Sequence, residues 1–284
     1  DNYSTENGGG VRCQDASPTL TDCVISYNHG DSGGGIGCIN SSPKLTNCTF
    51  IHNEADQSGG AMYNQAGSPS LINCILGDNI AVTGAAMYNC SSSSLIITNC
   101  TVTSHAAGSG AAINNVSSAA TITNSILWND AMDEIGNSSG GSATVTYSDV
   151  QGGWPGTGNI DVYPIFADPG SDKMRLTQYS PCIDKGSNTA PELYGTDYQG
   201  NLRIMDGDGD GAEVVDMGAY EFETSMVLIG RGGISVTIEP IEAVSAGTMW
   251  KVKDHNQCHS SGETVELPPG YHKIEFKELT GWFE

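Results

Sequence analysis

The side chains best suited to bind a metal form an acidic run close to residue 206. Asp206, Asp208 and Asp210 alternate with glycines, and a further glycine follows. Alternating carboxylates with a turn glycine are typical of the first half of a calcium-binding loop, because Ca²⁺ prefers oxygen ligands. Met217 replaces the glutamate that such loops carry at their twelfth position, and Asp216 lies one residue earlier. We therefore predict a calcium site of another loop type, with Asp206, Asp208, Asp210 and Asp216 as ligands. The alternative is a flexible acidic turn.

Acidic side chains are also the tools of glycoside hydrolysis, which needs two carboxyl groups within about 10 Å of each other. His52 and His105 are candidate bases, but both stand where a strand passes into a turn, so we expect them to be solvated. The acids of the later repeats form a loose group that shares no repeat position, which argues against a hydrolase: Asp56, Asp78, Asp130, Asp133 and Glu134.

The distribution of basic residues argues against a polysaccharide lyase. Such an enzyme needs a basic residue to remove a proton and cations to bind the sugar acids. The chain has 11 basic and 33 acidic residues, a net charge of −22, and only Arg12 and Lys44 precede Lys173. This charge repels nucleic acid and anionic lipid. We expect no nucleic-acid partner and, without a run of eighteen apolar residues, no membrane insertion.

The elements that must position these side chains come from an internal repeat. Blocks of small residues recur at steps of 25 or 26 residues, and an Asn/Asp-Cys pair follows each of the first four blocks by about fifteen residues. Self-similarity at this period indicates stacked units that bury their apolar sides against one another. The blocks begin at Gly8, Gly33, Gly59, Gly84 and Gly110.

Each unit contains short β-rich runs between turn residues, which predicts strands and no helix. The units lack the regular leucines of leucine-rich repeats and the GGxGxD core of calcium-binding nonapeptide repeats. We therefore predict an all-β chain with a right-handed parallel β-helix over residues 1–160. This solenoid has about 25 residues per coil, and its equivalent residues stack at the strand spacing of about 4.8 Å.

Stacking predicts columns of equivalent side chains along the solenoid. One inward column consists of cysteines, flanked by columns of leucine, isoleucine and other apolar residues. A neighbouring column consists of asparagines, whose amides bond to one another and which tolerate left-handed corners. The cysteines are Cys23, Cys48, Cys74 and Cys100, and the asparagines are Asn47, Asn73, Asn99 and Asn124.

The nine cysteines do not by themselves predict disulfides. Parallel side chains in one column give poor disulfide torsion angles, so we expect buried free thiols there. Cys13 and Cys38, at the corner of the glycine block, are the better candidates for a bridge.

Three motifs follow the last coil. They are SPCIDKG at Ser180–Gly186, DYQGNLR at Asp197–Arg203 and DMGAYE at Asp216–Glu221. This succession resembles the secreted right-handed β-helix proteins of environmental bacteria, planctomycetes among them, whose solenoid ends in a choice-of-anchor Q segment. The resemblance covers residues 8–222 and implies an extracellular or cell-surface location. It also implies that residues 161–224 form a C-terminal cap or anchor-type segment.

Residues 225–284 differ in composition, with five of the eleven basic residues and several alternating runs. They resemble a small β-sandwich module of the PEGA-like kind, and we expect it to be truncated before its last strand. We therefore divide the chain into 1–160, 161–224 and 225–284.

These observations favour a non-catalytic structural or adhesive protein of the cell surface. Tyr27, Tyr63 and Tyr88 can stack on neutral glycans or serve only to pack the coils. No amphipathic helix precedes the glycine block at Gly8, so we expect either further coils or a second copy at this end. Contact between copies of that kind is head-to-tail and extends into a filament. The alternative function is a polysaccharide lyase or glycoside hydrolase.

Overall fold

The computed structural model describes residues 2–128, 130, 133–167, 174–222, 232–235, 249–252, 258–267, 274–278 and 281–283. The chain divides into two compact units, Asp1–Thr224 and Ser225–Glu284. All described regular elements are strands or bridges, so the predicted all-β class is confirmed.

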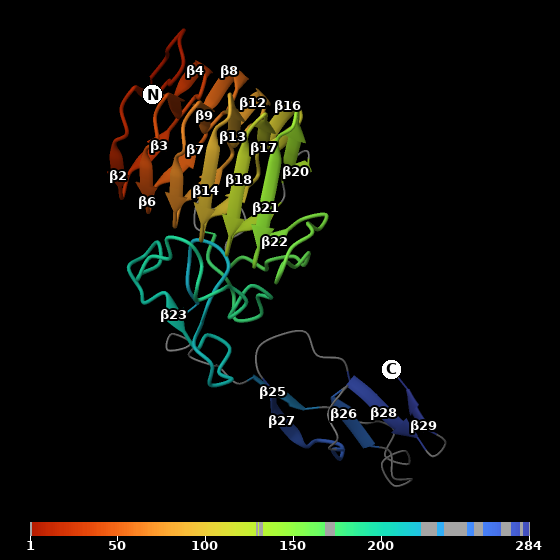
Figure 1. The fold of residues 1–284 in the computed structure, drawn as a ribbon. Coiled ribbons are helices and arrows are strands. Elements are labelled where there is room, and N and C mark those ends of the chain that lie inside the picture. The colour runs from red at the N-terminus through yellow and green to blue at the C-terminus, as the bar shows by residue number, and fades with distance from the viewer. Residues whose placement is uncertain are drawn as a thin grey trace. The chain divides into compact units, whose positions relative to one another are not determined.

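Four parallel sheets run along the first unit, and each takes one strand from every coil that it crosses (Figure 1). The first sheet contains β1 (Val11–Gln14), β5 (Ile36–Ile39), β9 (Met62–Gln65), β13 (Met87–Cys90), β17 (Ala111–Val116) and β20 (Asp133–Ser138). The second contains β2 (Thr19–Thr21), β6 (Lys44–Thr46), β10 (Ser70–Ile72), β14 (Ser94–Thr98), β18 (Ala119–Thr123) and β21 (Ser142–Thr146).

The other two sheets complete each coil. The third contains β3 (Val24–Ser26), β7 (Thr49–Ile51), β11 (Ile75–Gly77), β15 (Thr101–Thr103), β19 (Ile126–Trp128) and β22 (Asp149–Val150). The fourth contains β4 (His29–Ser32), β8 (Glu54–Ser58), β12 (Ile80–Thr83) and β16 (Ala106–Ser109). Strands that follow one another in the chain lie in different sheets, and each pairs with its equivalent one coil away. The predicted parallel β-helix is therefore confirmed.

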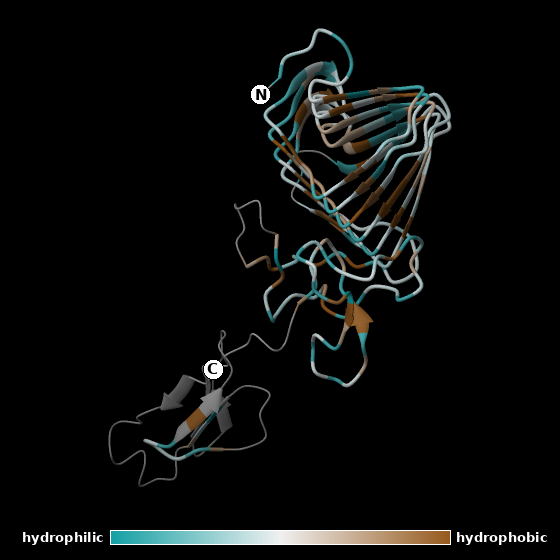
Figure 2. Cartoon of the chain, turned by 90° about the vertical axis from the view of Figure 1, so that its left-hand side faces the viewer, coloured by the Kyte–Doolittle hydropathy of each residue, from teal (hydrophilic) through white to brown (hydrophobic). Residues whose placement is uncertain are grey.

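The core consists of inward columns that run through successive coils. Leu45, Leu71 and Ile97 are in direct register and none is exposed to solvent. Phe50 and Leu76 form the equivalent column on the third sheet. Apolar segments recur at the same place in successive coils (Figure 2). This arrangement buries an apolar surface that no single coil could bury alone.

The corners of the coils need a left-handed backbone conformation. Asp22, Asn47, Asn73, Asn99 and Asn124 all have φ between 51° and 53°. Asparagine and aspartate adopt this conformation more readily than most residues, because their short polar side chains bond to the local backbone. The Asn/Asp-Cys marker in the sequence is thus the corner between the second and third sheets.

The last coil is closed by the chain that follows it directly. Trp154 packs against the core, and Asn159 donates from Nδ2 to the carbonyl oxygens of Val145 and Trp154. The amide of Tyr147 donates to the carbonyl of Thr157 at 2.8 Å. These contacts satisfy the edge of the final strands, so the end of the solenoid is covered by residues 154–160.

Residues 174–222, which we call the tail, cover the flank of the solenoid instead. The sequence predicts that 161–224 cap the end, but the tail packs on the outer face of the third sheet. Ile126 of that sheet lies in one cluster with Ile183 and Met217 of the tail, and Ile75 lies in another with Tyr220. The tail also contains a small hairpin of β23 (Ile204–Met205) and β24 (Val214–Val215). The physical reason is that the outward residues of this sheet are partly apolar and need cover.

The second unit contains two small antiparallel sheets. β25 (Gly232–Ser235) pairs with β27 (Thr264–Leu267), and β28 (Ile274–Glu278) pairs with both β26 (Met249–Val252) and β29 (Gly281–Phe283). The predicted runs therefore form strands where they are described, while the sandwich arrangement stays a prediction.

Candidate functional site

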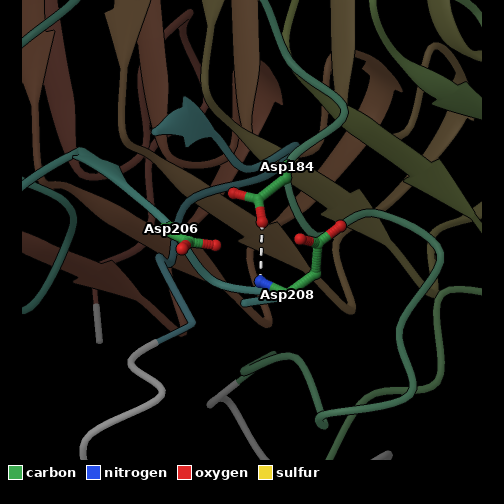
Figure 3. Close-up of side chains that lie close together, drawn as sticks. All are labelled: Asp184, Asp206 and Asp208. Carbon is green, nitrogen blue, oxygen red and sulfur yellow. Dashed lines mark hydrogen bonds between the residues drawn. The ribbon is translucent and has the colours of Figure 1, made fainter. Parts of the chain in front are cut away.

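Three carboxylates converge at the surface of the tail. Asp184, Asp206 and Asp208 each offer an oxygen, and these oxygens lie within 4.8 Å of one another. Figure 3 shows the three side chains around one point, with Asp184 coming from a different segment than the other two. The sequence predicts Asp206 and Asp208 but misses Asp184, because no spacing rule connects residues so far apart in the chain.

The backbone of residues 206–211, which we call the acidic loop, holds the three carboxylates in place. The amides of Gly207 and Asp208 donate to the two oxygens of Asp184, at 3.3 and 2.7 Å. Asp206 accepts hydrogen bonds from the amides of Gly209 and Gly211. Both glycines have positive φ, which lets the loop turn tightly enough to direct its amides inward. The carboxylates are therefore positioned by local hydrogen bonds.

The chemistry of this group fits a hard cation. All three donors are carboxylate oxygens, which Ca²⁺ prefers, and their separation allows one ion to contact them together. Partial burial raises the pKa of Asp184 above its ordinary value. Lys185 lies 3.6 Å from Asp208, an exposed contact that offsets part of the negative charge. Asp184, Asp206 and Asp208 are thus the residues that would hold calcium.

The other two predicted ligands lie outside this group of oxygens. Asp210 is exposed and accepts a hydrogen bond from the amide of Ala212. Asp216 is fully buried and accepts from the amides of Asp184 and Phe222, at 2.8 and 2.7 Å. Burial raises the pKa of Asp216 to about 7. Asp216 thus supports the backbone of Asp184 and does not share its cluster.

A second polar group attaches the tail to the solenoid. Arg203 is 1% exposed and lies 3.1 Å from a carboxylate oxygen of Glu221. The guanidinium also donates to Oδ1 of Asn73, at 2.6 Å, and to the carbonyls of Gly218 and Ala219. Burial raises the pKa of Glu221 above its ordinary value, and the adjacent Arg203 opposes this shift. The motif residues of the tail are therefore hubs of structural hydrogen bonds.

The asparagine column takes part in the same attachment. Within the column, Asn47 bonds to Asp22 and Asn73 bonds to Asn47, at 3.1 and 3.2 Å. Asn124 likewise bonds to Asn99 at 3.4 Å. Three members also donate to carbonyls of the tail: Asn73 to Thr196, Asn99 to Asp216 and Asn124 to Ser187. The column is thus both an internal ladder and a docking edge for the tail.

The cysteine column contains free thiols at successive corners. Cys48, Cys74 and Cys100 are fully buried, and each thiol donates to the carbonyl two residues earlier at 3.3–3.4 Å. Cys23, in the first coil, is only partly buried. Cys13 and Cys38, the expected exception, are also free although they are register partners. The bridge suggested by the sequence is therefore absent from the structure.

An acidic cluster that sequence reasoning dismissed lies inside the last coils. His105 is 2% exposed and Glu134 is 4% exposed, so the expectation of a solvated His105 is wrong. Burial and the neighbouring Asp130 together raise the pKa of Glu134 to about 10. The sequence did not predict this cluster, because Asp130 lies at a corner of its coil and Glu134 lies on strand β20. These positions do not repeat together, and the path of the coil brings the two side chains close.

Two of the exposed tyrosines, Tyr3 and Tyr27, lie in the first coils beside two partly exposed histidines. We call this group the aromatic corner: Tyr3, Tyr27, His29 and His52. Tyr3 stacks on His29 and Tyr27 on His52, each with ring centroids 4.8 Å apart. Tyr3 is 71% exposed and Tyr27 is 58% exposed. A carboxylate oxygen of Asp56 lies 3.1 Å from Nε2 of His29 and orients that ring. The aromatic corner therefore exposes two tyrosine rings, each of which stacks on a histidine of the next coil.

Another tyrosine pair lies on the outer face of the first sheet. Tyr63 and Tyr88 stack with ring centroids 5.8 Å apart and nearly parallel planes, and both rings are partly buried. Their neighbours Met62 and Met87 point into the core. The pair therefore contributes packing between coils as well as surface.

Comparison with known proteins agrees with this architecture. The family described as "Right handed beta helix region" matches residues 1–152, which is more than half of the 284 residues. No curated protein and no solved structure gives a significant match. Within the described residues, no helix has the length and hydrophobicity needed to cross a bilayer. The chain belongs to the right-handed β-helix family.

Proposed function

We propose that this protein is a non-catalytic structural or adhesive β-helix of the extracellular space or cell surface, and that its aromatic corner binds neutral glycans. The β-helix fold is found in adhesins and in polysaccharide-active enzymes, so the fold alone leaves both classes open. The observation that carries the adhesive proposal is the exposed ring surface of Tyr3 and Tyr27.

The charge of the chain selects the kind of glycan. A net charge of −22 repels uronate-rich and sulfated polymers. Sugar rings present C–H faces that stack on aromatic rings, and His29 and His52 add polar groups at the ring edges. Neutral glycans therefore fit the aromatic corner better than acidic ones.

The tail supports the location and a role for calcium. Its three motifs resemble a choice-of-anchor Q segment, and the second unit resembles a PEGA-like module, both of which accompany secreted solenoids. Calcium is abundant outside cells, where modules of modest affinity use it as a structural ligand. We propose that Ca²⁺ bound by Asp184, Asp206 and Asp208 stiffens the acidic loop.

A glycan array tests the proposal directly. We expect binding to neutral glycans that falls at least tenfold in Tyr27→Ala. Tyr163→Ala is the matched control, because Tyr163 is 51% exposed and lies outside the aromatic corner. Equal binding by wild type and Tyr27→Ala, or no binding to any neutral glycan, would contradict the glycan role.

Incubation with a panel of polysaccharides separates the adhesive function from the enzymatic one. Unsaturated products or new reducing ends at a sustained rate would favour a lyase or a hydrolase. Head-to-tail assembly is a separate expectation for the adhesive role, and sedimentation at rising concentration tests it. A strictly monomeric particle at all concentrations would end the assembly idea.

A further inference from the structure

A column of inward polar side chains runs through the solenoid, and its residue type changes from asparagine to histidine and aspartate in the last coils. It begins with Asn28, Asn53 and Asn79 and continues with His105 and Asp130. Each side chain accepts a hydrogen bond from the backbone amide of its equivalent one coil earlier, at distances from 2.5 to 3.2 Å. The acceptor role is therefore preserved in all five coils.

The donor role is preserved only in the asparagine part. Asn53 donates from Nδ2 to the carbonyl of Ile25, and Asn79 donates to the carbonyls of Phe50 and Gly77, all at 2.8–2.9 Å. An amide can accept at one end and donate at the other. A carboxylate can only accept hydrogen bonds. Asp130 can therefore replace the donor end of an asparagine only if one of its carboxylate oxygens carries a proton.

The structure leaves unsatisfied atoms at this point. Nδ1 of His105 accepts the amide of Asn79, so Nε2 of the neutral ring carries the proton. Three buried atoms have no hydrogen-bond partner among the described residues: Nε2 of His105, Oδ2 of Asp130 and Oε2 of Glu134. Such a concentration of unpaired buried atoms calls for a proton or a water molecule.

Glu134 enters the same cluster from the first sheet. Glu134 follows Asp133 on β20, and the register of this strand places it beside Ala112 of β17. The last coil therefore has a glutamate at the position where the preceding coil has an alanine. Its Oε1 faces the amide of Asp130 at 3.4 Å. A pocket of about 170 Å³ lies beside it, lined by Asp133, Glu134 and the closing segment from Val150 to Trp154. Glu134 thus links the end of the column to the closure of the solenoid.

No positive charge compensates the two acids in the described residues. Asp130 and Glu134 form no ion pair there, and the titratable groups that face them are His105 and Asp133. The closing segment contributes Gln151 and Trp154 to the pocket, neither of which titrates. Two carboxyl groups side by side cannot both be ionised without severe repulsion, and a hydrogen bond between them requires one proton.

We propose that Asp130 and Glu134 share one proton at neutral pH, and that this proton latches β20 to the corner of the preceding coil. Loss of the proton leaves the buried carboxylate of Glu134 beside the partly buried carboxylate of Asp130, which favours opening of the last coil. The pKa of Glu134, about 10 in the closed coil against an ordinary value of 4.5, agrees in direction with this geometry. The latch is closed in acid and at neutral pH and weakens as the pH rises.

Linkage predicts how steeply the latch weakens. One proton is retained in the closed state and released in the open state, so the opening equilibrium of β20 rises about tenfold per pH unit between these two pKa values. Hydrogen exchange of peptides that cover β20, corrected for the intrinsic exchange rate, measures this equilibrium. We expect the steep rise in the wild type and a flat profile in Glu134→Gln, whose amide supplies the hydrogen permanently.

Infrared spectroscopy locates the proton itself. The difference spectrum between the wild type and Glu134→Gln at pH 7.5 should contain the carbonyl stretch of a protonated carboxylic acid. The other buried acids contribute equally to both spectra and cancel. Asp130→Asn restores the ladder residue of the earlier coils and supplies a donor, so it should also lose the band. Asp133→Asn is the matched control, because Asp133 is the exposed neighbour of Glu134 and should keep the band.

Three outcomes would overturn the latch. A wild type without the band holds no shared proton. A band that persists in Asp130→Asn belongs to Glu134 alone, and sharing is then wrong. A wild-type exchange profile at β20 as flat as that of Glu134→Gln would show that the proton does not control opening.

Discussion

In the coils, a residue finds its partner one repeat away in the chain, whereas in the tail the partners have no common spacing. Leu71 contacts Leu45 and Ile97 by register, as every residue of its column contacts its equivalents. Arg203 instead joins Asn73, 130 positions away, to Glu221, 18 positions away. The coils spread their stability over many similar contacts, and the tail concentrates it in a few buried charges.

This difference predicts where single substitutions should lower the free energy of unfolding most. Removing one member of a column leaves its neighbours in place on both sides. Removing one member of the tail network leaves a buried charge without its counterpart, which strongly destabilises a folded chain. The following changes test the contrast.

Loss of Arg203 should have the largest effect. Arg203→Ala leaves Glu221 buried without its ion pair and Asn73 without a donor, and we expect a cost of about 3–5 kcal/mol. Denaturant unfolding measures the loss, and limited proteolysis should show that the tail is released first. Arg175→Ala, an exposed arginine of the same tail, is the control. Equal stability of the two variants would refute the hub role.

Truncation in the core of the coils should come next. Leu71→Ala creates a cavity between two neighbouring coils and should cost about 2–5 kcal/mol. Leu20→Ala in the first coil should cost less than half as much, because Leu20 is only partly buried. Urea titrations of both variants give the ratio. If the two costs are the same, the first coil is covered as well as the middle ones.

The pH dependence that arises from Asp149 of β22 should be weaker than these effects. Burial raises the pKa of Asp149 to about 7 from an ordinary 3.8. A raised pKa stabilises the fold below the ordinary value, and this contribution is lost as the pH rises through 7. Asp149→Asn should therefore be more stable than the wild type at pH 9, by about 1–2 kcal/mol, and similar at pH 4.

Thermal unfolding of both proteins from pH 4 to pH 9 checks this expectation. Glu54→Gln, at an exposed position of the coils, should follow the wild-type profile. A wild type that gains stability from pH 5 to pH 9 would contradict the raised pKa of Asp149.

Calcium should have the smallest effect. At ten times its dissociation constant, an ion that binds only the folded loop stabilises by about 1.4 kcal/mol. Calorimetry with Ca²⁺ and with chelator should show this increase in the wild type and not in Asp208→Asn. Asp210→Asn is the control, because Asp210 lies outside the group of converging oxygens. An increase that survives in Asp208→Asn would place the ion elsewhere.

The sequence was sufficient to predict the coils but only part of the candidate sites. Columns such as Leu45, Leu71 and Ile97 follow from period alone, because the repeat fixes which residues lie above one another. Asp184 could not be assigned to the acidic loop, since only the path of the tail brings it to Asp208. The meeting of Asp130 and Glu134 was missed for a related reason, because they belong to different columns of the same coil.

The first four repeats differ in length by one residue, and the structure localises this difference. The extra residue of the second coil lies within β8, where the register to β4 shifts, and that of the fourth coil lies near Ser91 and Ser92, both at positive φ. The other strands of the first four coils keep their alignment. Insertions of one residue at these two places therefore leave the solenoid intact, which makes them the natural positions at which to graft foreign peptides onto this scaffold.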